Sequence, residues 1–265
     1  MDKYTFRSGL NKIFGGHLLT LRKILKKHVT DDVYGRKLTY NPNTDIGATL
    51  FFCGAFEKKE LELCSNYIKK DSIIIDIGAN IGLHSIYFSQ FASEGLVISF
   101  EPARDTFNML LRNILDSDNI LPINAGVSDR TNIADFYVAS DNAYSSLKDT
   151  KRKDIVKRQR ILCFKLDDLF EKLQLERIDF IKIDVEGLEQ NVLQGMRGVI
   201  DTYQPIIFCE IYKGTNSNEH PEETIRLIAN RGYEVFVFDG NTLFPYEKHD
   251  DRFYNYLFIP ESKRQ

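Results

Sequence analysis

The sequence predicts an α/β fold with a doubly wound, mostly parallel seven-stranded sheet of the Rossmann-like kind. Two observations predict the sheet. From about residue 72, apolar β-rich runs alternate with stretches of helical periodicity, as expected where helices cover both faces of a parallel sheet. The first run ends in an acid and a glycine-rich turn, and open sheets of this class bind ligands at such strand ends.

Seven runs share a β-rich apolar composition bounded by turn residues, and we expect them to form the sheet. They are Ser72–Ile77, Leu96–Phe100, Ile120–Val127, Ile178–Val185, Pro205–Ile211, Tyr233–Phe238 and Tyr254–Ile259. The helices expected between them carry apolar residues three and four positions apart. They cover Phe56–Lys69, Gly82–Phe91, Arg104–Asp116, a stretch from Leu188, and Glu222–Arg231. A loop separates the last two runs where a helix would be needed for parallel pairing, which predicts an antiparallel hairpin at one edge.

We expect two parts in the chain, an N-terminal helical extension over residues 1–44 and one globular domain over residues 45–265. Within the extension, apolar residues recur at near-helical spacing over Arg7–Val29, with basic residues among them. A basic amphipathic helix can rest on an anionic membrane surface. Because Gly15–Gly16 interrupts the pattern, packing against the domain or a second subunit is the favoured interpretation, and the oligomeric state stays open.

Composition limits the classes of partner and compartment. The formal net charge of −3 gives no overall attraction for nucleic acid. The polar start Met1–Leu10 is unlike a signal peptide, and the apolar runs are shorter than the ~20 residues of a membrane span. The four cysteines lack the C-x-x-C spacing of a zinc or redox site. We therefore expect a cytoplasmic protein.

An acid and three turn residues follow the first predicted strand, namely Asp76, Gly78, Asn80 and Gly82. Glycines let the backbone leave the strand sharply and approach a ligand closely. A dinucleotide site requires Gly-x-Gly-x-x-Gly with no carboxylate facing the phosphates, whereas here Asp76 opens the turn and Asn80 replaces a glycine. A carboxylate there would repel a diphosphate but attract a ligand that carries an ammonium and a sulfonium group.

The second predicted strand also ends in an acid. Glu101 lies 19 residues after Gly82, near the interval of ~20 residues at which an acid binds ribose hydroxyls. S-adenosylmethionine has a ribose and no phosphate, so it satisfies both acids, whereas a nicotinamide cofactor satisfies one. The alternatives are that Asp76 and Glu101 cap helices, that the chain is a nicotinamide-dependent oxidoreductase, or that it is a non-catalytic cofactor-binding interaction module.

Five motifs in chain order resemble the FkbM-type methyltransferases, over roughly Phe51–Ile259. They are Asp76–Gly82, Phe100–Pro102, Asn124–Asp129, Ser145–Leu147 and Lys182–Gly187. The resemblance implies a class I methyltransferase fold that binds S-adenosyl-L-methionine and needs no obligatory metal. It places the methionine portion at Asp76, Gly78 and Asn80 in the turn that closes at Gly82, the ribose at Glu101, and the adenine near Asp129. It also implies O-methylation of a small hydroxyl-rich acceptor, such as a sugar or glycan precursor.

The acceptor side is expected at the next two strand ends. Strand periodicity places Lys182, Asp184 and Glu186 on one face, and Glu210 ends the neighbouring strand. Crowded carboxylates raise the pKa of at least one of them and so supply a general base. Lys182 would orient them or form a structural ion pair. The four residues are predicted to be catalytic, although clustered carboxylates could equally bind Mg²⁺ or Ca²⁺.

Four further residues are predicted to contact the acceptor. His84 lies on the first turn of the helix after the glycine-rich turn, where it lines the cleft or acts as a base near neutral pH. Tyr144, Ser145 and Ser146 belong to a polar loop expected to overhang the cleft. The basic run 148–160 forms a solvated face or attracts a phosphorylated acceptor. Because it has no aromatic residues for base stacking, nucleic acid is not favoured as the acceptor.

Overall fold

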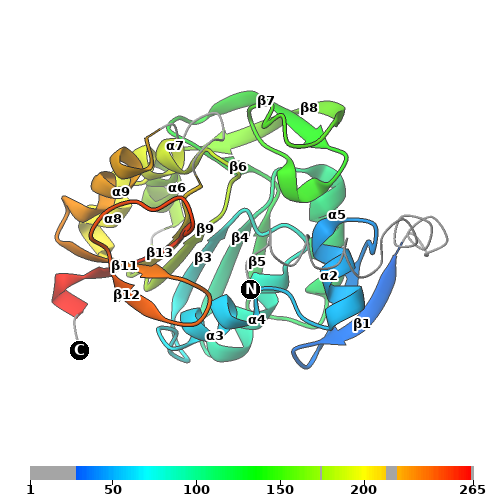
Figure 1. Cartoon of the computed structure of the whole chain (residues 1–265), viewed down its shortest axis with the longest axis horizontal. Coiled ribbons are helices and arrows are strands. Elements are labelled where there is room, and N and C mark those ends of the chain that lie inside the picture. The colour runs from blue at the N-terminus through cyan, green and yellow to red at the C-terminus, as the bar shows by residue number, and fades with distance from the viewer. Residues whose placement is uncertain (1–27, 174, 213–219, 264–265) are drawn as a thin grey trace.

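The structure is a computed structural model and describes residues 28–173, 175–212 and 220–263 (Figure 1). The helix expected over Arg7–Val29 lies almost entirely outside the described residues, and so does the surface on which both its favoured packing and the alternative of membrane contact depend. The described part of the segment assigned to a helical extension is instead an antiparallel hairpin, β1 (Val29–Val33) and β2 (Arg36–Tyr40). Its two turn residues, Tyr34 and Gly35, both have positive φ, as the tightest hairpin turns require.

The main sheet has eight strands in the order β12-β11-β13-β10-β9-β3-β4-β5. The strands from β10 to β5 pair in parallel, and β11, β12 and β13 pair antiparallel. The bounds are β3 Ile73–Ile77, β4 Leu96–Phe100, β5 Ile120–Ile123, β9 Phe180–Ile183, β10 Ile206–Glu210, β11 Tyr233–Phe238, β12 Leu243–Pro245 and β13 Asn255–Pro260. The prediction of seven strands is therefore wrong by one, because the loop before β13 adds the short edge strand β12.

A second sheet of three strands, in the order β6-β8-β7, stands beside the main one (Figure 1). It contains β6 (Gly126–Val127), β7 (Asn132–Ala139) and β8 (Ile155–Phe164). The strand predicted over Ile120–Val127 is thus divided between two sheets. Its first half pairs with β4, and its second half pairs with the end of β8. An apolar run shows that a segment is extended but not which strand it pairs with.

The helices cover both faces of the main sheet, which confirms the doubly wound arrangement. Their bounds are α2 Asp45–Cys53, α3 Lys58–Ser65, α4 Leu83–Phe91, α5 Arg104–Asn113, α6 Leu166–Leu173, α7 Glu189–Gln194, α8 Arg197–Tyr203 and α9 Pro221–Ala229. A short 3-10 turn, η1, spans Asn142–Tyr144, and another, η2, spans Glu261–Lys263. Among the helices in the described ranges, none has both the length and the apolar composition of a membrane span.

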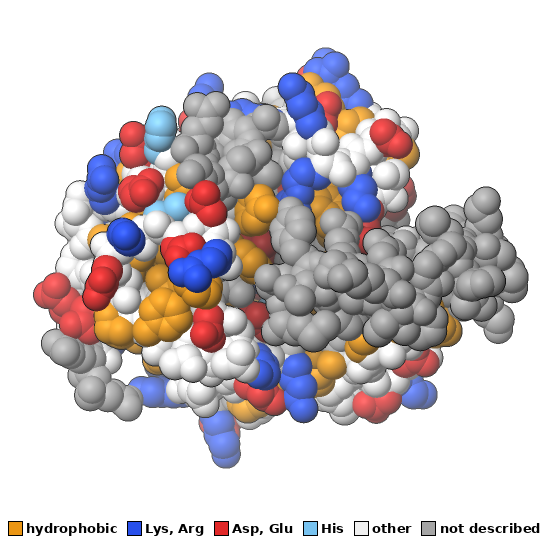
Figure 2. Space-filling model, viewed as in Figure 1, with side chains coloured by type: hydrophobic (Ala, Val, Ile, Leu, Met, Phe, Trp, Pro, Cys, Tyr) orange, Lys and Arg blue, Asp and Glu red, His pale blue; other side chains and the backbone are white. Residues whose placement is uncertain are grey.

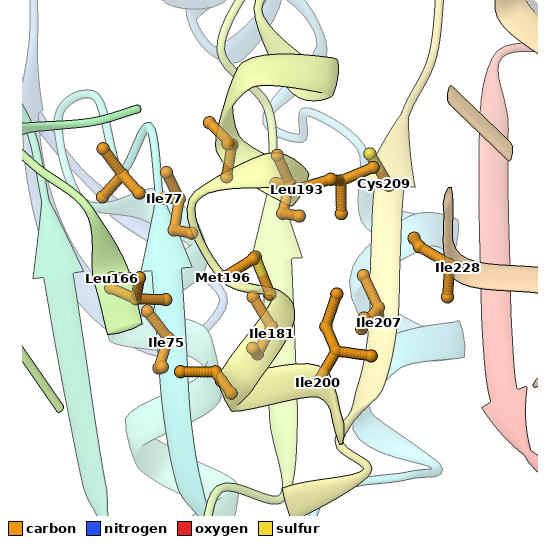
Figure 3. Packing of buried hydrophobic residues seen from close by; sticks show 14 of the residues in the cluster. Ile75, Ile77, Leu166, Ile181, Leu193, Met196, Ile200, Ile207, Cys209 and Ile228 are labelled. Atoms are coloured by element: carbon orange, nitrogen blue, oxygen red, sulfur yellow. The ribbon is translucent and has the colours of Figure 1, made fainter. Parts of the chain in front are cut away.

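Alternation along each central strand separates two hydrophobic cores. On one face Ile75, Ile181 and Ile207 pack with Leu193 and Met196 of the α7–α8 region (Figure 3). The opposite face buries a second cluster, which includes residues of α3, α4 and α5. The strand period places Asp76 on this second face, so its carboxylate points toward α4 rather than toward α7.

Candidate functional site

A cavity of about 450 Å³ opens at the carboxyl ends of the parallel strands β3, β4, β9 and β10. Its walls come from the turn after β3, the loop after β4, strand β6, the η1 segment, the starts of α2 and α3, and the turn after β9. Open α/β sheets bind their ligands at this edge. The size is that of a site for a small molecule.

The turn after β3 is held tightly against its two neighbouring strands. The backbone N–H groups of Gly78 and Ala79 donate to the carbonyl oxygen of Phe100 at 3.0 and 2.9 Å. Gly78 has φ +85°, and a Cβ there would overlap the carbonyl oxygen of Asp184. Asn80 also has positive φ, and Gly82 caps α4 with φ +89°. The turn therefore brings backbone and the Asn80 side chain to the cavity wall.

Asp76 is fully buried beneath the cavity and does not belong to its lining. Its Oδ2 accepts a hydrogen bond from Ser85 Oγ at 2.6 Å, and Ser99 Oγ donates to Ser85 at 2.8 Å. Its Oδ1 lies 3.6 Å from Lys182 Nζ and accepts no hydrogen bond from any described residue. Asp76 can therefore act on a ligand only through its charge and through Lys182.

Glu101 does reach the cavity, with 7% of its surface exposed. Burial raises the pKa of its carboxyl to about 7, although the N–H groups of Ala103 and Asn80 donate to it at 2.7 and 3.0 Å and favour the charged form. An apolar recess lies beside this carboxylate. It is formed by Pro102, Val127, Phe136, Leu147 and Ile161.

Lys182 is the centre of the acidic cluster and is 4% exposed. Its ammonium donates to the carbonyl oxygen of Gly78 at 3.4 Å and lies 3.4 Å from Asp184 Oδ2. Burial by itself would lower the pKa of Lys182, but the neighbouring carboxylates outweigh burial and raise it. They are Asp184, Asp76, Glu57 and Glu210. Lys182 is therefore a permanent cation among acids.

The acids predicted from the fourth and fifth strands all meet at the cavity. Asp184, Glu186 and Glu210 belong to its lining. Glu186 has positive φ and pairs with Arg152, whose Nη1 lies 2.5 Å from Glu186 Oε2. The Arg152 guanidinium lies over the Tyr144 ring at 4.3 Å. In the described part of the chain, no group of three or more His, Cys, Asp or Glu side chains is arranged to hold a metal ion.

The η1 segment forms the roof of the cavity, and hydrogen bonds join it to the other walls. Asn142 Nδ2 donates to Asn80 Oδ1 at 2.7 Å, and the Tyr144 hydroxyl donates to Asp45 at 2.8 Å. Ser146 Oγ approaches the carbonyl oxygens after β9 at 3.4 Å, while Ser145 Oγ accepts the N–H of Ala139. Asn142 Oδ1 is buried and accepts no hydrogen bond from the residues described.

His84 and a residue that the sequence did not indicate, Glu57, complete the wall near α3. Their Nε2 and Oε2 atoms lie 3.4 Å apart. Other residues on the lining were also not predicted as site residues, because no motif marks them and contacts distant in sequence place them. They are Asp45, Arg152, Tyr212 and Tyr254. Conversely, Asp129 does not line the cavity, and a hydrogen bond from Arg130 holds the pKa of Asp129 below its usual range.

Comparison with known proteins matches residues 76–235 to the family described as methyltransferase FkbM domain. The hexuronic acid methyltransferase AglP of Haloferax volcanii is 27% identical over 177 residues, 65% of this chain and 68% of that protein. The 2-O-methyltransferase NoeI of Sinorhizobium fredii is 26% identical over 152 residues, 52% of this chain and 63% of that one. The solved methyltransferase FkbM of Methylobacillus flagellatus is 19% identical, with a TM-score of 0.49. The match covers 80% of this chain but only 47% of the solved one.

Proposed function

This chain belongs to the FkbM methyltransferase family, and from that premise we propose that it transfers a methyl group from S-adenosylmethionine to a hydroxyl of a sugar or glycan precursor. The observation that carries the proposal is Glu101, a carboxylate at the cavity wall beside an apolar recess. A carboxylate can accept hydrogen bonds from both ribose hydroxyls, and the recess suits an adenine ring.

The charges around the cavity fit a cationic donor. Among the described residues of its lining, seven carboxylates, which include Glu57, Asp184 and Glu210, outnumber the four cations Lys58, Lys59, Arg152 and Lys182. Such a site attracts an ammonium and a sulfonium group and repels a diphosphate, which counts against a nicotinamide cofactor. When bound, S-adenosylmethionine supplies a methyl group already activated by the positive charge on sulfur.

The residues of this chain would hold the donor as follows. Glu101 binds the ribose, and the turn at Gly78 and Asn80 binds the methionine portion, with Asp76 acting from beneath through Lys182. Gly82 sets the direction of α4 rather than touching the ligand. The adenine contact is proposed for the apolar recess beside Pro102, since Asp129 lies away from the cavity.

The acceptor would bind at the opposite end, where hydroxyl-rich and aromatic groups meet. Tyr144, Tyr212 and Tyr254 line the cavity, as do Asp184 and other carboxylates. The three rings lie near one another, because Arg152 lies over both Tyr144 and Tyr212 and Tyr254 packs against Tyr212. Tyrosine faces and carboxylates together suit a sugar ring, since one covers its apolar face and the other accepts its hydroxyl protons. The relatives named for hexuronic acid and for 2-O-methylation support this acceptor class. Acidic and basic side chains are interspersed across the described residues of the face in Figure 2, which gives no support to a nucleic-acid acceptor.

The test has two stages. Calorimetric titration with S-adenosylhomocysteine should show binding, and titration with NADH should show none. A screen of sugars, nucleotide sugars and glycan fragments with isotope-labelled donor, read by mass spectrometry, should then show a mass gain of one methyl group. Absence of S-adenosylhomocysteine binding would reject the donor. Binding without transfer to any acceptor would favour a cofactor-binding interaction module.

Donor affinity should depend on pH through Glu101. The charged carboxylate is the form that accepts two ribose hydroxyls, and its pKa is about 7 in the free protein. The affinity for S-adenosylhomocysteine should therefore be constant above about pH 8 and should fall as the pH drops through 7 toward 5, by up to tenfold per unit. In Glu101→Gln the affinity should be low and this pH dependence lost. The same dependence in both proteins would contradict the assignment.

Asn142 should contribute to donor affinity by fixing the roof to the turn after β3. Asn142 lines the cavity, and Asn142→Ala removes both its hydrogen bond to Asn80 and its buried side-chain oxygen. We expect a loss of S-adenosylhomocysteine affinity of roughly tenfold, the value of about one hydrogen bond, measured by calorimetry. Asn43→Ala is the matched control, because Asn43 is exposed and bonds only locally to Asn41. Equal affinities of the two variants would overturn the prediction.

A further inference from the structure

A buried histidine and glutamate face each other in the wall of the cavity, where α3 and α4 begin. His84 lies in the first turn of α4 and Glu57 directly precedes α3, so different elements supply the two side chains. Only 8% of the His84 side chain and 16% of the Glu57 side chain are exposed. Both residues line the cavity, and among the described residues His84 is the only histidine that lines it.

Glu57 is held in a conformation that a helix cap does not require. Its φ of +52° is left-handed, which is disfavoured for a residue with a Cβ, and such strain concentrates at functional sites. Its carboxylate makes no cap hydrogen bond to the N–H groups of α3 within the described structure. The side chain is instead directed at His84, so the ordinary explanation of an acid at a helix start does not account for it.

Three other acids of the cavity, Asp184, Glu186 and Glu101, have strong partners. Asp184 faces the permanent cation Lys182, and Glu186 pairs with Arg152. Glu101 accepts hydrogen bonds from two backbone N–H groups. These contacts suit side chains that orient a ligand. Imidazole is the group that takes up and releases a proton near neutral pH.

Resting on the function proposed above, we propose that His84, oriented by Glu57, is the general base that removes the proton of the acceptor hydroxyl. The O–H bond of the acceptor breaks and its proton passes to the imidazole. The acceptor oxygen forms its bond to the methyl carbon, and the sulfur keeps the electron pair of the broken carbon–sulfur bond. Glu57 stabilises the imidazolium that results, and Asp184 orients the hydroxyl.

Titratable groups on neighbouring elements surround Glu57. Glu60 and Cys64 lie on α3, Lys182 on β9, and Tyr34 in the β1–β2 turn. Burial raises the pKa of Tyr34 to about 12, with Glu57 and Glu60 adding to the effect. Burial alone would lower the pKa of Lys182, but carboxylates that include Glu57 raise it. Neither group therefore titrates between pH 5 and 9, and Glu57 is the carboxylate in contact with His84, at 3.4 Å.

The first experiment titrates the histidines by NMR in the full-length protein labelled with ¹⁵N-histidine. His84→Gln assigns the signal, and Glu57→Gln should lower the pKa of His84 by about one unit, because it removes a negative charge beside the ring. Glu62→Gln, which changes an exposed acid on α3, should leave this pKa unchanged. An unchanged His84 pKa in Glu57→Gln would overturn the proposal.

The second experiment measures methyl transfer to methyl β-D-glucuronide and methyl β-D-glucoside. His84→Gln should lower kcat by roughly 10²-fold or more while S-adenosylhomocysteine affinity stays within about twofold. In Glu57→Gln the acidic limb of the kcat profile should move down in pH with the NMR value. If His84→Gln kept the wild-type kcat, or lost much of its donor affinity, His84 would not be the general base. If the wild type binds S-adenosylhomocysteine but methylates neither probe, the proposed acceptor class is wrong. The NMR titration then still tests whether Glu57 acts on the pKa of His84.

Discussion

Gly78→Ala is expected to lower the free energy of unfolding by about 3 kcal/mol or more and to abolish measurable S-adenosylhomocysteine binding. Two effects add. The backbone at Gly78 has φ +85°, which strains any residue with a Cβ, and the new methyl group would overlap the carbonyl oxygen of Asp184 and lie 3.0 Å from its carbonyl carbon. Because that contact is to backbone, β3 and β9 would have to separate at the cavity floor. Chemical denaturation and calorimetry measure the two losses.

Gly232→Ala separates the two effects. Gly232 has a similar φ of +75°, but no described atom outside its chain neighbours lies within 4 Å of a Cβ placed there. This control should lose only about 1 kcal/mol and should keep its donor affinity. If both variants lost the same stability, the close approach of the turn to Asp184 would have no role in the site.

The positions of the main-sheet strands along the chain and the turn at Gly78 could be predicted because each depends on local sequence. Apolar runs give the strands, and positive φ requires glycine at a tight turn. The meeting of Asp184 and Glu210 followed from the fact that parallel strands end at one edge. These predictions needed no knowledge of which loop lies over which strand.

The remaining features depend on contacts that no local pattern encodes. Asp76 could be placed at the end of its strand from the sequence, but its burial beneath the cavity depends on its contacts with Ser85 and Lys182. Glu57 reaches His84 because α3 packs beside α4, and an isolated acid before a helix is ordinarily explained as a cap. Arg152 sits in a basic run that resembles a solvated surface, yet Glu186 and Tyr144 hold it at the cavity.

Lys182→Met should be the most destabilising change of charge in the protein, at about 3–5 kcal/mol near pH 7. Lys182 is 4% exposed, and its removal leaves Asp76 and Asp184 without the cation that offsets their burial. Lys58→Met is the control, since Lys58 is 60% exposed and its i,i+4 pair with Glu62 should contribute less than about 0.5 kcal/mol. Chemical denaturation at fixed pH compares them.

A double-mutant cycle identifies the cause of that loss. If it arises from an uncompensated buried charge, Asp76→Asn introduced into Lys182→Met should restore part of the stability, although Asp76→Asn alone destabilises wild type. If it arises only from lost packing of the lysine side chain, the two changes should add and the double variant should be the least stable of all. The first result would show that Asp76 and Lys182 form one electrostatic unit beneath the cavity, and the second would remove that link between the turn after β3 and the acids of β9.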